Sequence, residues 1–438
     1  MSAESASFAR YFDRLAEAET LPVVGQVVRT VGLLVESQGP PARVGDMCEL
    51  EAEKGEAPAT LEVVGFREGR LLTVPLGGTA GIRAGARIIQ RGRSGTVPVG
   101  PALLGRVLDG LGNPIDGLGP IGATTPAPLH PAPLNPLDRD PIVAPLGTGV
   151  RAIDAMLTCG RGQRLGLFGG SGVGKSTLLG MMARGTNADV SVIALVGERG
   201  REVRGFLEHD LGAEGLRRSV VVVSTSDNPP LMRLRAAFTA TAIAEYFRAE
   251  GRHVLLMMDS VTRLAMAQRE VGLAAGEPPT AKGYPPSVFT MLPVLLERAG
   301  SLSGRGSITG LYTVLVEGDD TTEPIADSVR AILDGHVILS RDLAARNHYP
   351  AIDILHSISR TMPEVTTAEH RLKAGQVRDW MALVRENEDL VSVGAYVPGT
   401  NPRVDAAFAR REAIDAFLRQ PVDTQCSMTE AVEALATL

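Results

Sequence analysis

The sequence is poor in cysteine and in long apolar runs. Its three cysteines, Cys48, Cys159 and Cys426, lie far apart and fit neither a disulfide framework nor a metal-ligand spacing, so we expect reduced thiols. No run approaches the roughly 18 apolar residues of a membrane span, and the opening MSAESASFARYF lacks the charged-then-apolar order of a secretion signal. These absences predict a cytoplasmic protein whose association with a membrane is peripheral and depends on partners.

The chain also lacks the basic excess and the aromatic residues that nucleic-acid-binding proteins use. It has 44 Lys and Arg against 50 Asp and Glu, a net charge of −6, and only 4% aromatic residues. Because a phosphate backbone binds to a basic face and unpaired bases stack on aromatic rings, no nucleic-acid partner is expected. With 438 residues, 44% of them hydrophobic, the chain is long enough for two or three globular domains.

The pattern changes twice before residue 145. Residues 1–21 place Phe8 and Phe12 on one side of an expected helix, which either packs on its own domain or docks a partner protein. Over residues 22–95, short β-rich runs between Gly, Pro and Asp turns predict a small β-barrel. Residues 96–145 are rich in Pro and Gly, which predicts a linker.

Apolar runs alternate with helical segments in residues 146–365. This alternation predicts a largely parallel sheet covered by helices on both faces. Residues 366–438 are mostly helical by pattern and are expected to form a C-terminal helical domain. The expected fold class is therefore α/β, with a small N-terminal barrel and a helical C-terminal domain. The expected strands of the sheet are residues 164–168, 190–197, 219–225, 253–259, 308–316 and 336–340.

A glycine-rich loop stands between the first of these strands and a helix. Residues 169–176 read GGSGVGKS and match the G-x-x-x-x-G-K-[ST] pattern of nucleotide-binding loops. Backbone N–H groups of such a loop surround a β-phosphate, and the helix N-terminus adds partial positive charge. Lys175 is expected to reach the β- and γ-phosphates, and Ser176 to ligate Mg²⁺. The predicted nucleotide-binding residues are Gly169, Gly170, Ser171, Gly172, Val173, Gly174, Lys175, Ser176 and Thr177.

Two carboxylates follow later strands of the same expected sheet. Asp259 ends the run HVLLMMD, and a carboxylate at the tip of a buried strand can hold Mg²⁺ through water. Glu198 follows the next strand after the loop, where hydrolysis needs a carboxylate to orient and deprotonate the attacking water. A surface Glu198 paired with Arg199 or Arg201 is the alternative at this position.

Phosphoryl transfer also needs positive charge at the γ-phosphate, and an arginine supplied across an interface is a common source. Most arginines are merely solvated, and spacing alone does not choose among those of the core segment. The candidates are Arg199, Arg263, Arg330, Arg341 and Arg360.

Taken together, these residues resemble the catalytic subunits of rotary-type ATPases and, within that family, the flagellum-specific ATPases of the type III protein export apparatus. The resemblance runs from about residue 22 to residue 420. It rests on LLGRVLDGLGNPIDG (103–117), PLGTGVRAIDAMLTCGRGQRLGLFGGSGVGKS (145–176), GERGREV (197–203), a run that begins MMDSVTRLAMAQRE (257–270), and VEGDDTTEPIADSVRAILDGHVILSRDLAARNHYPAIDILHSISR (316–360).

The resemblance implies a RecA-like P-loop ATPase core that hydrolyses ATP with Mg²⁺. By position in the family motifs, Lys175 and Glu198 are catalytic and Arg199 and Arg263 are active-site arginines. Arg360 matches an arginine finger that reaches the nucleotide of a neighbouring subunit. A chain with both loop and finger implies a homohexameric ring with shared sites. Implied partners are a stator-like regulator on the N-terminal helix, a coiled-coil stalk in the ring pore, complexes of export substrates with their chaperones, and a membrane export gate.

Several relatives share parts of this pattern. The virulence injectisome ATPases share GEPP, VEGDD and HYPAID, whereas MAQRE and LVSVGAY (390–396) favour the flagellar side. A proton-translocating ATP synthase subunit, a hexameric RNA helicase and a non-enzymatic scaffold ring are the remaining alternatives. Rotary relatives hold adenine with aromatic residues near the segment 417–428, but the nearest residues in this chain are Val422 and Met428. The resemblance therefore does not assign the residues of the base pocket, and neither of these two is taken as a site.

Overall fold

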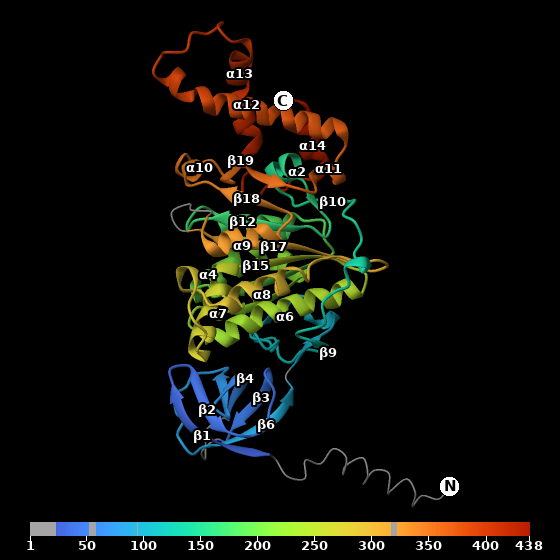
Figure 1. The fold of residues 1–438 in the computed structure, drawn as a ribbon. Helices are drawn as coiled ribbons and strands as arrows, with labels where there is room; N and C mark the ends of the chain where they lie inside the picture. The colour runs from blue at the N-terminus through green and yellow to red at the C-terminus, as the bar shows by residue number, and fades with distance from the viewer. Residues whose placement is uncertain (1–22, 52–57, 94, 317–321) are drawn as a thin grey trace, which may run out of the picture. The chain divides into compact units, whose positions relative to one another are not determined.

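The computed structural model describes residues 23–51, 58–93, 95–316 and 322–438 (Figure 1). The chain divides into two units between Gly95 and Thr96. The helix expected at residues 1–21 lies outside the described residues, as does most of the VEGDD motif.

The first unit is a six-stranded barrel, as the β-rich pattern predicted. Its strands follow the order β1-β2-β5-β4-β3-β6, and β6 pairs antiparallel with β1 to close the barrel. Alternate side chains point inward and form an apolar core that includes Val35, Leu61 and Ile88. The strands are β1 (Val24–Val31), β2 (Leu34–Gln38), β3 (Asp46–Leu50), β4 (Ala59–Arg67), β5 (Arg70–Pro75) and β6 (Arg87–Arg93).

The second unit is built on one large sheet whose strands follow the order β19-β18-β12-β17-β15-β13-β14-β8. Every neighbouring pair from β18 to β8 is parallel, whereas β19 runs antiparallel to β18 and the short β16 pairs antiparallel with β17. All six predicted strands are present, and β19 was not predicted. Their bounds are β12 (Arg164–Gly169), β13 (Val190–Val196), β14 (Ser219–Ser224), β15 (His253–Asp259), β16 (Gly300–Ser301), β17 (Ser307–Leu315), β18 (Gly335–Leu339) and β19 (Ile352–Ser359).

The Pro/Gly-rich segment expected to be a linker also supplies short strands. Its β8 (Val107–Leu108) forms an edge of the large sheet, β7 (Thr96–Val99) pairs with β9 (Thr125–Pro128), and β10 (Pro145–Leu146) pairs with β11 (Cys159–Gly160). The segment after β8 folds back because the Arg106 guanidinium donates two hydrogen bonds, of 2.7 and 2.9 Å, to the Asp116 carboxylate. Strands of two to four residues are too short to give a periodic signal, so the composition concealed them.

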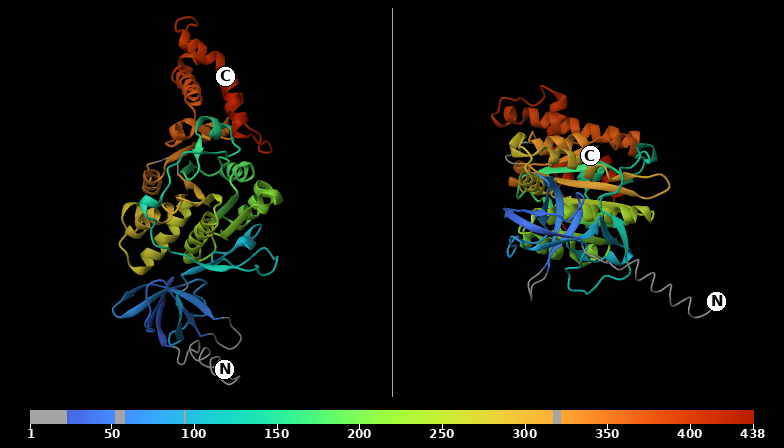
Figure 2. Two further views of the ribbon diagram at one scale, coloured as in Figure 1. Left: turned by 90° about the vertical axis from the view of Figure 1, so that its right-hand side faces the viewer. Right: turned by 60° about the horizontal axis from the view of Figure 1, so that its bottom comes forward.

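Helices cover both faces of the sheet (Figures 1 and 2). One face packs against α2, α3 and the C-terminal helices in a single apolar cluster, and helices α6, α7 and α9 contact the strands from the other side. Among the described residues, no helix combines the length and apolar character that crossing a bilayer requires. The helices are α2 (Arg151–Met156), α3 (Lys175–Gly185), α4 (Gly200–Gly205), the π-helix η3 (Phe206–Leu211), α5 (Gly212–Arg217), α6 (Pro230–Ala249), α7 (Val261–Ala275), α8 (Pro286–Leu296), α9 (Pro324–Ile332), α10 (Arg341–Ala345), α11 (Met362–Val365), α12 (Ala368–Ser392), α13 (Pro402–Leu418) and α14 (Met428–Ala436), with 3₁₀ turns η1 (Pro101–Leu103), η2 (Pro136–Asp138) and η4 (Ala281–Gly283).

Helix α3 and the π-helix η3 approach each other closely at Gly180. A Cβ atom at this position would lie 2.6 Å from both the Cβ and the carbonyl oxygen of Asp210. The side chain of Asp210 also accepts a hydrogen bond from Thr177 of α3. The contact matters for function because α3 follows the glycine-rich loop, whereas η3 continues the helical segment that begins just after Glu198.

We predict that Gly180→Ala lowers the free energy of unfolding by about 1–3 kcal/mol, because the added methyl group must push η3 away from α3. Gly375→Ala is the matched control. Gly375 lies exposed in the middle of α12 with nothing within 4 Å of its added Cβ, and there alanine should raise stability by about 0.4–1 kcal/mol. Thermal unfolding of both variants at one protein concentration measures the difference, and equal shifts would refute the close contact.

Candidate active site

The glycine-rich loop joins β12 to α3 at the carboxyl edge of the sheet. Gly172 and Gly174 have φ angles of 82° and 88°, in the left-handed region that favours glycine. At Gly170 a Cβ atom would meet the guanidinium of Arg341, which lies at the flexible end of its side chain. Gly174 directly precedes α3, whose first residue is Lys175. The loop and the free N–H groups of the helix N-terminus therefore offer an anion-binding cradle.

Lys175 and Asp259 form a buried ion pair at this edge. The Lys175 Nζ lies 2.8 Å from the Asp259 Oδ1, and the two side chains are 9% and 3% exposed. Thr313, on the strand β17 between β12 and β15, donates its hydroxyl to the same Oδ1 at 2.7 Å. The ion pair thus brings together the lysine and the acid that the sequence placed on separate strands.

Ser176 and Asp259 have the chemistry of a magnesium site. Ser176 is exposed in the first turn of α3, and the contacts of Asp259 with Lys175 and Thr313 both use Oδ1, so Oδ2 can accept a metal-bound water. Over the part of the chain that the structure describes, no group of three His, Cys, Asp or Glu residues could hold a metal unaided. This donor set fits Mg²⁺, which keeps several waters and binds through one or two protein oxygens together with substrate phosphates.

Glu198 lies just after β13 and next to the ion pair. Its side chain is 13% exposed, and its Oε1 accepts a hydrogen bond of 3.1 Å from the Arg263 Nε. Arg263 is held in the first turn of α7, where the Ser260 hydroxyl caps the helix by accepting from the Arg263 N–H at 3.3 Å. The structure therefore brings Glu198 and Arg263 together with the Lys175–Asp259 pair, and Glu198 is not a surface glutamate paired with Arg199 or Arg201.

The environment of Glu198 makes it a weaker acid than an ordinary glutamate. Burial, the negative charge of Asp259 and a hydrogen bond with Glu202 raise the pKa of Glu198 to about 7, against the opposing effect of Lys175 and Arg263. A carboxylate that titrates near neutral pH can accept a proton from water and release it again. The site thus places a glycine-rich loop, the Lys175–Asp259 pair and a carboxyl group that titrates near neutral pH at one edge of the sheet.

Arg199 borders this cluster through Glu202, whereas Arg360 lies away from it. Arg199 caps α4, its side chain is 62% exposed, and its guanidinium lies 3.5 Å from Glu202. Arg360 follows β19, and its backbone N–H donates to the Asp334 carbonyl at 2.9 Å at the amino end of β12. Since β12 has six residues, at about 3.3 Å each its ends are about 17 Å apart. Arg360 is therefore at the opposite edge of the sheet from the loop of its own chain.

The two remaining candidate arginines also have defined places. Arg330 pairs with Asp327 on the same helix at 2.9 Å, so it has a local partner on α9. Arg341 starts α10 and packs its guanidinium against the loop at Gly170. Neither lies in the cluster around Glu198.

Sequence reasoning missed Tyr349 as a candidate binding residue. A Cβ atom at Gly174 would meet the Tyr349 ring at 3.4 Å, and the tyrosine is 39% exposed. The buried Gln420 donates its backbone N–H to the Tyr349 carbonyl at 3.0 Å and holds the Gly149 carbonyl with its side chain at 2.8 Å. An exposed aromatic ring beside a phosphate cradle can stack on a nucleotide base. The motif HYPAID contained this signal but served only as a mark of family.

Three family models match consecutive parts of the chain. The beta-barrel domain of the ATP synthase alpha/beta family matches residues 27–92, and the nucleotide-binding domain of the same family matches residues 149–359. The T3SS EscN ATPase C-terminal domain matches residues 366–437. Each of the three models lies in a different part of the described fold.

Similar proteins match over nearly the whole chain. The flagellum-specific ATP synthase of Pseudomonas aeruginosa is 52% identical over 445 residues, covering 100% of this chain and 99% of that protein. The type 3 secretion system ATPase of Xanthomonas euvesicatoria is 52% identical over 414 residues, covering 94% and 93%. The assembled ATPase EscN, solved with its central stalk EscO from enteropathogenic E. coli, matches with a TM-score of 0.87 and 45% identity over 94% of this chain and 99% of that one.

We predict that the raised pKa of Glu198 produces an acid limb near pH 7 in kcat/KM for ATP hydrolysis. Below its pKa the protonated carboxyl cannot accept a proton from water, so the rate should fall about tenfold per pH unit, whereas an ordinary glutamate would place the limb near pH 4.3. Steady-state phosphate release over a range of pH measures the limb.

Glu202→Gln separates this limb from the ionisation of ATP itself. The substitution removes the carboxylate that raises the pKa of Glu198 by hydrogen bonding, so the limb should move to lower pH, while the ionisation of ATP is the same for both proteins. A limb that stays in place would contradict its assignment to Glu198.

Proposed function

Because the chain belongs to the ATP synthase alpha/beta family, with a C-terminal domain of the type III secretion ATPases, we propose that it hydrolyses ATP to energise type III export of flagellar proteins. It is an ATPase of that family. The hydrolytic step rests on one observation, the position of Glu198 beside the buried Lys175–Asp259 pair. The flagellar assignment is supported by the Pseudomonas aeruginosa relative, which aligns with 100% of this chain, against 94% for the Xanthomonas euvesicatoria secretion ATPase.

Lys175 has two successive partners in the proposed reaction. Without nucleotide it neutralises Asp259, and when ATP enters the loop, its ammonium turns to the β- and γ-phosphates and leaves Asp259 free to serve the metal. Mg²⁺, when bound through Ser176 and Asp259, neutralises charge on the phosphates. An ion pair that a phosphate can replace keeps the ammonium group beside the loop before the substrate arrives.

Glu198 completes the chemistry as the general base. Its carboxylate orients the attacking water and takes one proton as the water oxygen bonds to the γ-phosphorus and the bond to the β–γ bridging oxygen breaks, which gives ADP and phosphate. Arg263 holds the carboxylate in place through its 3.1 Å hydrogen bond. Tyr349 would stack on the base, because its exposed ring stands next to the loop.

Arg360 is proposed to act on the nucleotide of a neighbouring subunit. It is exposed and lies at the opposite edge of the sheet from its own loop, so a loop that it serves must come from another chain. The solved relative EscN is an assembled ATPase with a central stalk, and we extend this arrangement to a homohexameric ring of the present chain around a coiled-coil stalk. A stator-like regulator on residues 1–21, substrate–chaperone complexes and a membrane export gate complete the proposed partners, at the cytoplasmic face of the membrane.

An injectisome is the second candidate setting, because the Xanthomonas euvesicatoria secretion ATPase is as similar in sequence, at 52% identity. In that setting the same hydrolysis would energise export of virulence proteins. The chemistry of the site does not differ between the two settings, so only the exported cargo separates them.

We expect Glu198→Gln to bind ATP normally and to lose about 10²–10⁴-fold in turnover, because the amide keeps the shape of the side chain but accepts no proton. Glu412→Gln, on the exposed surface of α13, is the matched control and should behave as wild type. Phosphate release by the purified proteins, and secretion of flagellar proteins by the source bacterium, measure the two consequences. Intact secretion with lost turnover would favour a scaffold ring, and lost virulence secretion with normal swimming would favour the injectisome.

Mixed rings test whether Arg360 acts in trans. Arg360→Ala and Lys175→Ala proteins should each keep only a small residual rate alone, but in a random equal mixture about a quarter of the interfaces pair an intact loop with an intact finger. Phosphate release should therefore recover to a clear fraction of the wild-type rate. No recovery in rings shown to contain both proteins would exclude Arg360 as the finger.

A further inference from the structure

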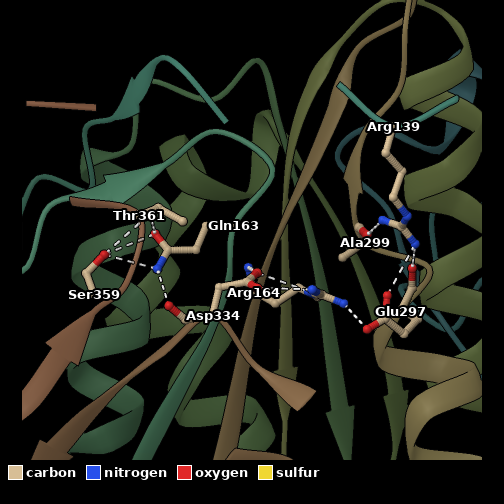
Figure 3. Close-up of polar contacts among 8 residues, drawn as sticks. All are labelled: Arg139, Gln163, Arg164, Glu297, Ala299, Asp334, Ser359 and Thr361. Carbon is tan, nitrogen blue, oxygen red and sulfur yellow. Dashed lines mark hydrogen bonds and ion pairs between the residues drawn. The ribbon is translucent and has the colours of Figure 1, made fainter. Parts of the chain in front are cut away.

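The residue that precedes β12, Gln163, is fully buried and uses both polar atoms of its side chain (Figure 3). Its Oε1 accepts hydrogen bonds from the Thr361 hydroxyl at 2.7 Å and from the Gly160 N–H at 2.8 Å. Its Nε2 donates to the Ser359 hydroxyl at 3.0 Å and to the Asp334 carbonyl at 3.2 Å. A buried amide with all of these bonds formed has one allowed orientation, because any rotation leaves buried polar groups unpaired.

Three of these partners lie next to Arg360, two of them in the sequence and the third through a hydrogen bond to its backbone. Ser359 and Thr361 are its two neighbours and are 8% and 9% exposed. The Asp334 carbonyl that accepts from Gln163 also accepts from the Arg360 backbone N–H, at 2.9 Å. Buried hydrogen bonds to Gln163 therefore hold the backbone on both sides of the exposed arginine. We call this set of bonds the Arg360 support.

The Arg360 support is also bonded to the start of β12. Arg164 donates its backbone N–H and its Nε to the Asp334 Oδ2 at 2.9 and 3.0 Å, and its Nη2 to Oδ1 at 3.0 Å. The same guanidinium pairs with Glu297, which in turn pairs with Arg139 (Figure 3). The far end of β12 leads into the phosphate loop, so one strand carries the loop at one end and the support of Arg360 at the other.

The backbones around the Arg360 support are closely packed. Gly335, which pairs with Ser359, would place a Cβ atom 2.5 Å from the Ile358 carbonyl oxygen and 3.2 Å from the Gln163 Nε2. The backbones of β18 and β19 are thus in close contact beside the amide.

We propose that Gln163 is a positioning residue for Arg360. It holds the backbone of residues 359–361 in the geometry from which the arginine reaches the nucleotide of the neighbouring subunit. This inference rests on the proposed action of Arg360 in trans. None of the hydrogen bonds of its side chain reaches its own subunit's cluster around Glu198, and three of them end on Ser359, Thr361 and Asp334 around the arginine, so we place its effect there. A misplacement of about 1 Å at a group that stabilises a transition state can cost about a hundredfold in rate.

Gln163→Met tests the proposal, because methionine has a similar volume and none of the hydrogen bonds. The variant should lose about tenfold to a hundredfold in kcat, with a KM for ATP within about twofold of wild type, since its own loop is intact. In an Arg360→Ala background the same substitution should cause no further loss. A merely structural role would lower kcat additively in both backgrounds, and that result would overturn the proposal.

Mixed rings show whether Gln163→Met impairs the subunit that donates the arginine or the subunit that binds the nucleotide. Gln163→Met subunits should recover activity when mixed with Lys175→Ala subunits, which supply an intact finger, and should not recover when mixed with Arg360→Ala subunits. Recovery in the second mixture would overturn the proposal. If instead Arg360→Ala and Lys175→Ala fail to complement each other, the trans action of Arg360 is wrong, so the two failures are distinguishable.

A second pair of variants tests the same contact if Gln163→Met does not fold. Thr361→Val removes the hydroxyl that donates to the Gln163 Oε1 and keeps the shape of the side chain, whereas Thr361→Ser keeps the hydroxyl. Valine should reproduce the loss in kcat and serine should restore most of the rate. Equal rates for the two variants would show that the hydrogen bond to Gln163 does not position Arg360.

Discussion

The buried ion pair between Lys175 and Asp259 is the interaction on which the rest of the site depends. Either charge alone at this depth would be uncompensated, and removing one partner of a buried pair costs about 3–5 kcal/mol. The pair therefore ties the loop helix α3 to the end of β15 across β17, with Thr313 as the bridge. Its geometry sets where a phosphate and a metal can lie, because both must replace or share its contacts.

Burial raises the pKa of Glu198 most, and the charges of the same pair act on it as well. Asp259 and Lys175 act on this carboxyl in opposite directions, and Arg263 adds a second positive charge in direct contact. In the proposed reaction a nucleotide changes the partner of Lys175, which would link substrate binding electrostatically to the ionisation of Glu198.

Much of this architecture could be predicted from the sequence, and the rest could not for identifiable reasons. The loop, Asp259 and Glu198 each follow a strongly apolar strand, so the parallel topology alone predicts that they share one edge of the sheet. The place of Arg360 depends on β19, an antiparallel edge strand whose pairing with β18 no periodicity reveals. Gln163 and Tyr349 were missed because each depends on residues distant in the sequence, Thr361 and Gln420 among them.

Strand β12 joins the phosphate loop of one subunit to the Arg360 support of the same subunit, whose arginine is proposed to act on the nucleotide of the next subunit. In a closed ring each such strand points the same way around the circle, because every interface is heterologous and repeats the same contact. In the proposed ring a stiff connection of this kind would give hydrolysis a direction. The occupancy of one loop would affect the neighbour that receives its arginine more than the neighbour on the other side. The order in which the sites of the ring hydrolyse ATP would then follow from the direction of the chain in a single six-residue strand.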